Sequence, residues 1–252
     1  SGEEIGDTYY AALAASNIVL GSILSGENLK DIEQDIHFYL EFIQHHKIED
    51  QNIVQNFYKD FISVLFSKPH KCIDKYFQKF NALKNNNLLS FYYIAKIKLF
   101  YLFNEYKNNL KIAEKSLELI EYSRGLYYLP EHYLYYALTI AGIYNELSSS
   151  EQQKYLKIFH YNLKKMKKWA KSCPANFEPK YLLMLAELAR IQGKPERANT
   201  LYDQAIEKAR QNQFIQVEAI ASECKARFYL ELENTESAKL YFEKAHTLYT
   251  KW

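Results

Sequence analysis

The residues that could carry out metal or acid–base chemistry are few in this sequence, and their spacing does not suit that chemistry. His45 and His46 form its one adjacent histidine pair. Neighbouring residues of a helix point about 100° apart, so the pair makes a poor metal site, and no HExxH motif or Cys/His cluster supports it. We expect both histidines to be exposed or to lie at a helix end.

Glu131 and His132 could be read as an acid–base couple, but they follow Pro130, a residue that often opens a helix. A glutamate in the first turn of a helix is favourable by itself, because it faces the positive end of the helix dipole. The sequence therefore favours a structural role for this pair.

The three cysteines lie far apart and belong to no nucleophile or ligand motif; they are Cys72, Cys173 and Cys224. Unpaired thiols of this kind are typical of the reducing cytosol, and a buried cysteine acts as a small apolar residue. We therefore predict no catalytic residue, no metal and no cofactor, and a cytoplasmic location. An all-helical hydrolase or metal enzyme is the remote alternative.

Residues 154–171 hold a run of lysines on the outside of an expected helix. The apolar residues of this segment recur at helical spacing and predict a buried stripe: Leu156, Phe159, Leu163, Met166 and Ala170. Lys154 falls outside the stripe with Lys157, Lys164, Lys165, Lys168 and Lys171. A solvated face needs no further explanation. A docking surface for an acidic protein segment comes second, and nucleic acid last, because arginine is scarce here and no stacking motif accompanies the lysines.

The composition indicates a helical protein. The 252 residues include 23 Tyr and 15 Phe but only 7 Gly and 5 Pro, too few turn-forming residues for a β-sandwich or barrel. The net charge of +2 is too small to indicate nucleic acid or a membrane as the partner. We expect no membrane span, since the apolar run at 91–103 is broken by Lys96 and Lys98.

Apolar residues recur at intervals of three and four between regularly spaced breaks, which predicts eleven or twelve helices joined by short loops. Their expected ranges are 7–24, 29–45, 50–66, 72–83, 88–104, 108–123, 130–147, 151–171, 181–192, 195–211, 214–232 and 235–249.

Two of these segments repeat each other without gaps. Residues 196–206 align with residues 236–246 at a period of 40. Small residues recur at matched positions, with an aromatic between them: Ala186, Ala198, Tyr202 and Ala205 in one unit, and Ala226, Ala238, Phe242 and Ala245 in the next. Small residues let two antiparallel helices approach closely, and the aromatic fills the gap to the next hairpin. This pattern resembles the tetratricopeptide repeat (TPR).

The segment from about residue 150 to 252 resembles, more narrowly, the helical-repeat region of very large bacterial signalling kinases. The resemblance rests on short runs of residues at matching spacing, among them Lys168-Trp169, Asn176-Phe177, Lys180-Tyr181-Leu182, Phe228-Tyr229-Leu230 and Trp252. In that family the helical array follows a serine/threonine-kinase-like domain and a signalling ATPase, and commonly precedes a GAF domain and a histidine kinase. The resemblance implies a regulatory segment. The kinase and ATPase motifs of those proteins, GxxxxGK[ST], HRD, DFG and GxGxxG, do not occur in this chain, so their activities do not carry over.

We therefore predict an all-α fold, a right-handed superhelix of stacked helical hairpins. Residues 1–147 would hold degenerate hairpins and residues 148–252 the TPR-like ones, in one continuous solenoid. The expected function is non-catalytic binding of a protein, a peptide or a flanking domain of the same polypeptide. The concave face would carry the contact residues Lys180, Leu183, Glu187, Arg190, Glu223 and Arg227. A free-standing peptide-responsive regulator is the alternative.

Overall fold

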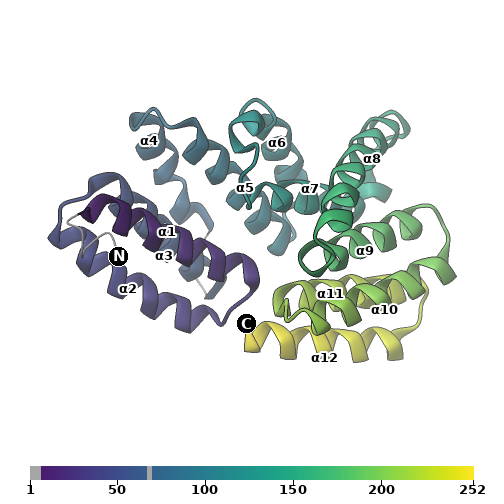
Figure 1. The fold of residues 1–252 in the computed structure, drawn as a ribbon. Helices are drawn as coiled ribbons and strands as arrows, with labels where there is room; N and C mark the ends of the chain where they lie inside the picture. Colours follow the sequence, from purple (N-terminus) through teal and green to yellow (C-terminus); the bar gives the residue numbers. More distant parts are fainter. Residues whose placement is uncertain (1–6, 67–69) are drawn as a thin grey trace.

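The computed structural model describes residues 7–66 and 70–252, and over these ranges it contains helices and no strand (Figure 1). The α-helices are α1 (Thr8–Ser25), α2 (Leu29–His45), α3 (Glu49–Phe66), α4 (Lys75–Ala82), α5 (Asn86–Leu102), α6 (Tyr106–Ser116), α7 (Leu129–Ile143), α8 (Ser149–Ser172), α9 (Pro174–Ile191), α10 (Pro195–Gln211), α11 (Ile215–Glu231) and α12 (Thr235–Lys251). Short 3₁₀ turns lie at His70–Ile73, Ile120–Ser123 and Tyr144–Glu146. The predicted all-α, TPR-like solenoid is confirmed.

The helices stack as antiparallel hairpins in two layers. Each helix packs on the next in the chain, and the odd-numbered helices also contact one another, α1 with α3, α5 with α7, α7 with α9 and α9 with α11. The odd-numbered helices therefore form the inner layer. One buried cluster runs from Ile97 to Phe228, and another runs from Val19 to Tyr128 and includes Trp252. Because α5 contributes to both, the apolar core continues along the chain.

The small residues of the repeat lie where helices approach most closely. Ala186 and Ala198 are fully buried between α9 and α10, and Ala226 and Ala238 are buried between α11 and α12. The aromatic position behaves as the repeat predicts in the first unit, where Tyr202 is buried against Phe228 of the next hairpin. The spacing of small residues thus sets the distance between the helices of a hairpin.

Three predicted helix boundaries are wrong by four residues or more. Helix α7 ends at Ile143 rather than at Leu147, because a 3₁₀ turn follows it. Helix α9 begins at Pro174, seven residues before the expected start at Tyr181, and holds Pro179 inside its second turn. The hydrogen bond that Pro179 cannot donate would go to the Ala175 carbonyl, in an exposed first turn where water can replace it. Helix α6 stops at Ser116 rather than continuing to Ser123, and a 3₁₀ turn takes over.

The solenoid curves until its two ends meet (Figure 1). The backbone N–H of Leu29, at the start of α2, donates to the Trp252 carbonyl at 2.7 Å, and the Asn28 side-chain amide donates to the Lys251 carbonyl at 2.8 Å. From α11, the Gln216 amide donates to the Leu24 carbonyl at 2.9 Å. Gly26 lies beside Gln216 with a φ of +87°, and a Cβ there would collide with the glutamine side chain. The first and last hairpins are therefore joined by direct hydrogen bonds.

Helix α1 is, in the described part of the chain, the one helix long and apolar enough to cross a membrane by length and composition. The expectation of no membrane span rested on the apolar run at 91–103 and did not consider residues 8–25, for which it stays a prediction. In the fold, 39% of this segment is buried, and α1 packs on α2 and α3. The core helix of a folded domain meets the same criterion.

The close contact at Ala198 gives a first prediction. Replacing Ala198 with Leu should lower the free energy of unfolding by about 1–3 kcal/mol, because α9 and α10 leave no room for the added carbons. Ala175→Leu is the matched control on the exposed first turn of α9 and should change stability by less than about 0.5 kcal/mol. Urea denaturation measures both. Equal effects of the two substitutions would contradict the tight packing.

Candidate interaction site

The predicted contact residues of the concave face lie on α9 and α11, both helices of the inner layer. Leu183 is 0% exposed, and Lys180 and Glu187 are also buried. Arg190, Glu223 and Arg227 are half-buried. Most of these side chains therefore touch other parts of the chain rather than solvent.

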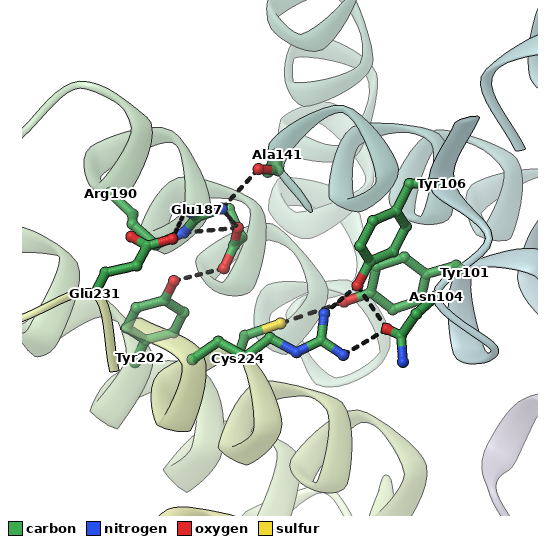
Figure 2. Close-up of polar contacts among 10 residues, drawn as sticks. Tyr101, Asn104, Tyr106, Ala141, Glu187, Arg190, Tyr202, Cys224 and Glu231 are labelled. Carbon is green, nitrogen blue, oxygen red and sulfur yellow. Dashed lines mark hydrogen bonds and ion pairs between the residues drawn. The ribbon is translucent and has the colours of Figure 1, made fainter. Parts of the chain in front are cut away.

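Arg190 joins three helices of the inner layer (Figure 2). Its guanidinium donates to Glu187 at 2.7 Å, to Glu231 of α11 at 2.6 Å and to the Ala141 carbonyl of α7 at 2.7 Å. The Tyr202 hydroxyl donates to the other oxygen of Glu187 at 2.5 Å. Burial and then the Glu187 charge raise the pKa of Tyr202 well above its ordinary value, so this hydroxyl keeps its proton. Glu187 is thus a buried carboxylate with its partners in place.

Arg227 and Cys224 connect α11 to the end of α5, the start of α6 and the turn between them. Figure 2 shows Cys224 beside Tyr101, with Asn104 and Tyr106 next to them. Arg227 donates to the Tyr106 hydroxyl and to Asn104, the latter at 2.6 Å, and pairs with Glu223. Cys224 lies 3.3 Å from the Tyr101 hydroxyl. Burial raises the pKa of the Cys224 thiol far above its ordinary value, so the thiol is not a nucleophile at neutral pH. The cavity among these side chains holds about 50 Å³, too little for a peptide.

Lys180 belongs to a buried triad in the middle of the solenoid. Glu131 of α7 accepts from Lys180 of α9 at 2.7 Å and from Lys98 of α5 at 3.4 Å, and all three side chains are buried. Burial by itself raises the pKa of Glu131, but the two ammonium groups outweigh burial and hold this pKa below its usual value. For Lys98, burial dominates over the attraction of Glu131 and lowers the pKa. The triad therefore couples three inner helices through one carboxylate.

These contacts use most of the polar groups that were predicted to meet a partner. A ligand that binds Lys180, Glu187 or Arg190 has to displace an internal ion pair first. That the six predicted residues contact a partner stays a prediction.

An open groove remains where the two ends of the solenoid meet. It has a volume of about 620 Å³ and lies between α12 on one side and α2, α3 and α5 on the other. Three aromatic side chains are exposed in it, Phe66 (45%), Phe103 (43%) and Phe242 (37%). Glu223 is the one predicted contact residue that lines it, and there it accepts from Tyr249 at 2.7 Å. The groove offers apolar contact area with a single acidic group on α11.

Little in the sequence predicts this groove, because its walls come from distant parts of the chain. The repeat identifies Phe242 as the counterpart of Tyr202. Phe66 and Phe103 stand directly at or after the ends of α3 and α5, and nothing in their spacing predicts that they meet α12.

The histidines and Glu131, which the sequence offers for metal or acid–base chemistry, have structural roles or lie exposed. His45 and His46 are exposed, as predicted, and His46 forms the C-cap of α2. Glu131 lies in the first turn of α7, as predicted. His132 is buried beside Ser116, and burial lowers its pKa to about 3. In the part of the chain that the structure describes, no three His, Cys, Asp or Glu side chains are placed to hold a metal ion.

The lysine run lies on α8, the longest helix. Ser148 and Glu151 form a capping box at its start. Phe159 and Met166 of the predicted stripe are buried. Lys165 is half-buried, and the other predicted basic residues are exposed: Lys157, Lys164, Lys168 and Lys171.

Residues 34–241, well over half of the chain, match the family model described as CHK1-like, TPR repeats. The chain belongs to this family. Comparison with curated proteins and comparison with solved structures gave no match. The CHK1-like TPR assignment agrees with the helical hairpins and buried alanines, and TPR repeats are protein-interaction modules. A non-catalytic repeat domain fits both the family and the fold.

The buried triad gives a prediction on pH dependence. The folded-state pKa of Glu131 lies below its unfolded value of about 4.3, so the stabilisation is present above about pH 4.3 and is lost as the pH falls through the folded value. Glu131→Gln should lower the free energy of unfolding by about 3–5 kcal/mol near pH 7, with the deficit shrinking below about pH 4. Urea denaturation at several pH values measures this. Glu233→Gln, at an exposed position, is the control, and a deficit independent of pH would contradict the triad.

The Arg190 contacts give a prediction on stability. Arg190→Ala leaves the buried Glu187 carboxylate with Tyr202 alone, and the free energy of unfolding should fall by about 3–5 kcal/mol. Arg210→Ala removes an exposed arginine that also pairs with a glutamate three residues before it, and should cost less than about 1 kcal/mol. Thermal denaturation followed by circular dichroism compares them. Similar losses for both variants would show that Arg190 is not needed to compensate Glu187.

Proposed function

We propose that this chain is a cytoplasmic, non-catalytic interaction segment of a bacterial signal-transduction kinase. It would bind a partner protein or a flanking domain of the same polypeptide through the groove where the two ends of the solenoid meet. The CHK1-like TPR family supports the interaction role, and the resemblance of residues 150–252 to the helical arrays of signalling kinases supports the context. The groove with its exposed aromatic residues is the observation that carries the proposal.

The repeat itself indicates what the groove binds. Tyr202 of α10 is buried against Phe228 of the following hairpin, whereas the equivalent Phe242 of α12 is 37% exposed in the groove. An apolar helix or extended segment that packs on Phe242 would cover it as α11 covers Tyr202. Phe66 and Phe103 would contact the same segment from the opposite wall.

Binding in this groove would act on the shape of the solenoid. One wall belongs to the first hairpins and the other to the last helix, and few hydrogen bonds join them. A ligand that contacts both walls binds the closed solenoid more tightly than an opened one. It therefore shifts the equilibrium toward the closed form, by as much as its affinities for the two forms differ. A change in the curvature of the solenoid would then transmit the binding event to the flanking domains of the same polypeptide.

A free-standing peptide-responsive regulator would use the same groove. The two contexts differ in the reading frame: the kinase context requires a kinase domain and a phosphate-binding loop in the same polypeptide. Sequencing the full reading frame decides between them, and a frame without those domains would contradict the kinase context but not the groove.

The groove is tested by binding measurements on matched variants. Phe242→Ala and Phe103→Ala should each weaken binding of the module to the flanking domains of its reading frame by about tenfold or more, because each removes an aromatic contact. Phe38→Ala removes a more exposed phenylalanine of α2 outside the groove and should leave affinity unchanged. Isothermal titration calorimetry measures all three. Unchanged affinity in the groove variants would contradict the proposed site.

A further inference from the structure

Helix α8 carries a basic face that the fold does not use. The helix holds seven lysines and one glutamate, Glu151 in its first turn. Between described residues, Lys154 is the one lysine of α8 in an ion pair, with Glu114 of α6. The remaining lysines extend from Lys157 to Lys171 without an acidic side chain among them.

The exposed side chains form a straight stripe. Counting about 100° per residue, Lys157, Tyr161, Lys164, Lys168 and Lys171 all fall within about 40° of one line along the helix. At 1.5 Å per residue this stripe is about 21 Å long. The opposite side of α8 packs into the protein through Tyr155, Phe159, Asn162 and Met166.

An aromatic ring lies in the middle of the charges. Tyr161 is 52% exposed, and the Lys165 ammonium lies 5.1 Å from the centre of its ring. Aromatic residues surrounded by charged ones are frequent anchors of protein interfaces, because the ring gives contact area at a small entropic cost. The stripe thus combines positive charge with one apolar anchor.

We propose that this stripe, called here the α8 basic face (Lys157, Tyr161, Lys164, Lys168 and Lys171), docks a short acidic protein segment that places an apolar side chain on Tyr161. Its length matches about 15 residues of a helix. The proposal is independent of the groove, which α8 does not line.

Charge favours a short segment over a long polyanion. The whole chain has a net charge of +2, and α8 alone carries seven lysines against one glutamate, so the rest of the chain is net negative. A nucleic acid or an anionic membrane would extend beyond α8 over this negative remainder and be repelled. The face also has no arginine for bidentate phosphate contacts and a single ring for stacking. An acidic segment of the length of α8 meets only the favourable charges.

The test uses a fluorescently labelled, glutamate-rich helical peptide of about 15 residues with a central leucine. Its matched control carries Gln at every Glu position. Affinity for the chain is measured by anisotropy at about 50 mM and about 300 mM salt, since screening must weaken a contact of this kind. A single-stranded oligonucleotide and phosphatidylserine vesicles are titrated in parallel.

Three variants decide the outcome. The triple variant Lys157→Glu, Lys164→Glu and Lys168→Glu should weaken peptide binding at least about tenfold, whereas the same change at the exposed Lys47, Lys84 and Lys111 should weaken it by less than about twofold. Tyr161→Ala leaves the charge unchanged and should weaken binding at least about threefold. Circular dichroism confirms that each variant is folded.

Equal losses in the two triple variants would show attraction by net charge alone and overturn the proposal, as would affinity independent of Tyr161. Tighter binding of the oligonucleotide or the vesicles than of the acidic peptide would also overturn it. Retained binding in the groove variants Phe242→Ala and Phe103→Ala separates this surface from the groove.

Discussion

The inner layer of this solenoid depends on buried ionic groups that have partners on neighbouring helices. Taking a carboxylate or an ammonium out of water costs several kcal/mol unless a partner compensates it. Glu131 finds its partners on α5 and α9, and Glu187 receives hydrogen bonds from Arg190 and from Tyr202 of α10. The contacts between helices form only when these helices stand at one separation and one angle. The buried charges thus select one curvature among those that the apolar contacts would allow.

That curvature brings the ends of the array together and creates the groove. A straighter stack of the same hairpins would separate α12 from α2 and α3, and the aromatic residues on the two sides would no longer share a cavity. The closing hydrogen bonds involve backbone carbonyls at the chain's last residues and at Leu24. The groove is therefore a product of the bend, which is why a ligand in it and the shape of the solenoid are linked.

The groove and the α8 basic face suit different partners, because one is apolar and the other is positively charged. The groove is apolar and concave, so its contacts gain from removing aromatic area from water. The α8 basic face is convex and charged, so its contacts depend on salt and on the sign of the partner. A module with both can hold two segments at once, since α8 does not line the groove.

The sequence by itself determined most of the helices, the hairpin repeat and its TPR-like character, because these depend on local periodicity and on small residues at fixed spacing. Ala186, Ala198, Ala226 and Ala238 were identified correctly as helix contacts for this reason. The outward position of the α8 lysines was also predicted correctly, because the period of a single helix determines which side chains face outward. The division at 147/148 stays a prediction, and the core continues through α7 and α8 across it.

Only the tertiary structure decided which polar residues are internal and where the open groove lies. The helical period puts Lys180 and Glu187 on the inner layer, but their partners lie on other helices: Glu131 of α7 for Lys180, and Tyr202 of α10 for Glu187. Phe103 and Phe242 lie in one groove although 139 positions separate their numbers. Such contacts follow from the summed bend of many hairpin interfaces, each a small angle, and no local pattern in the chain encodes that sum.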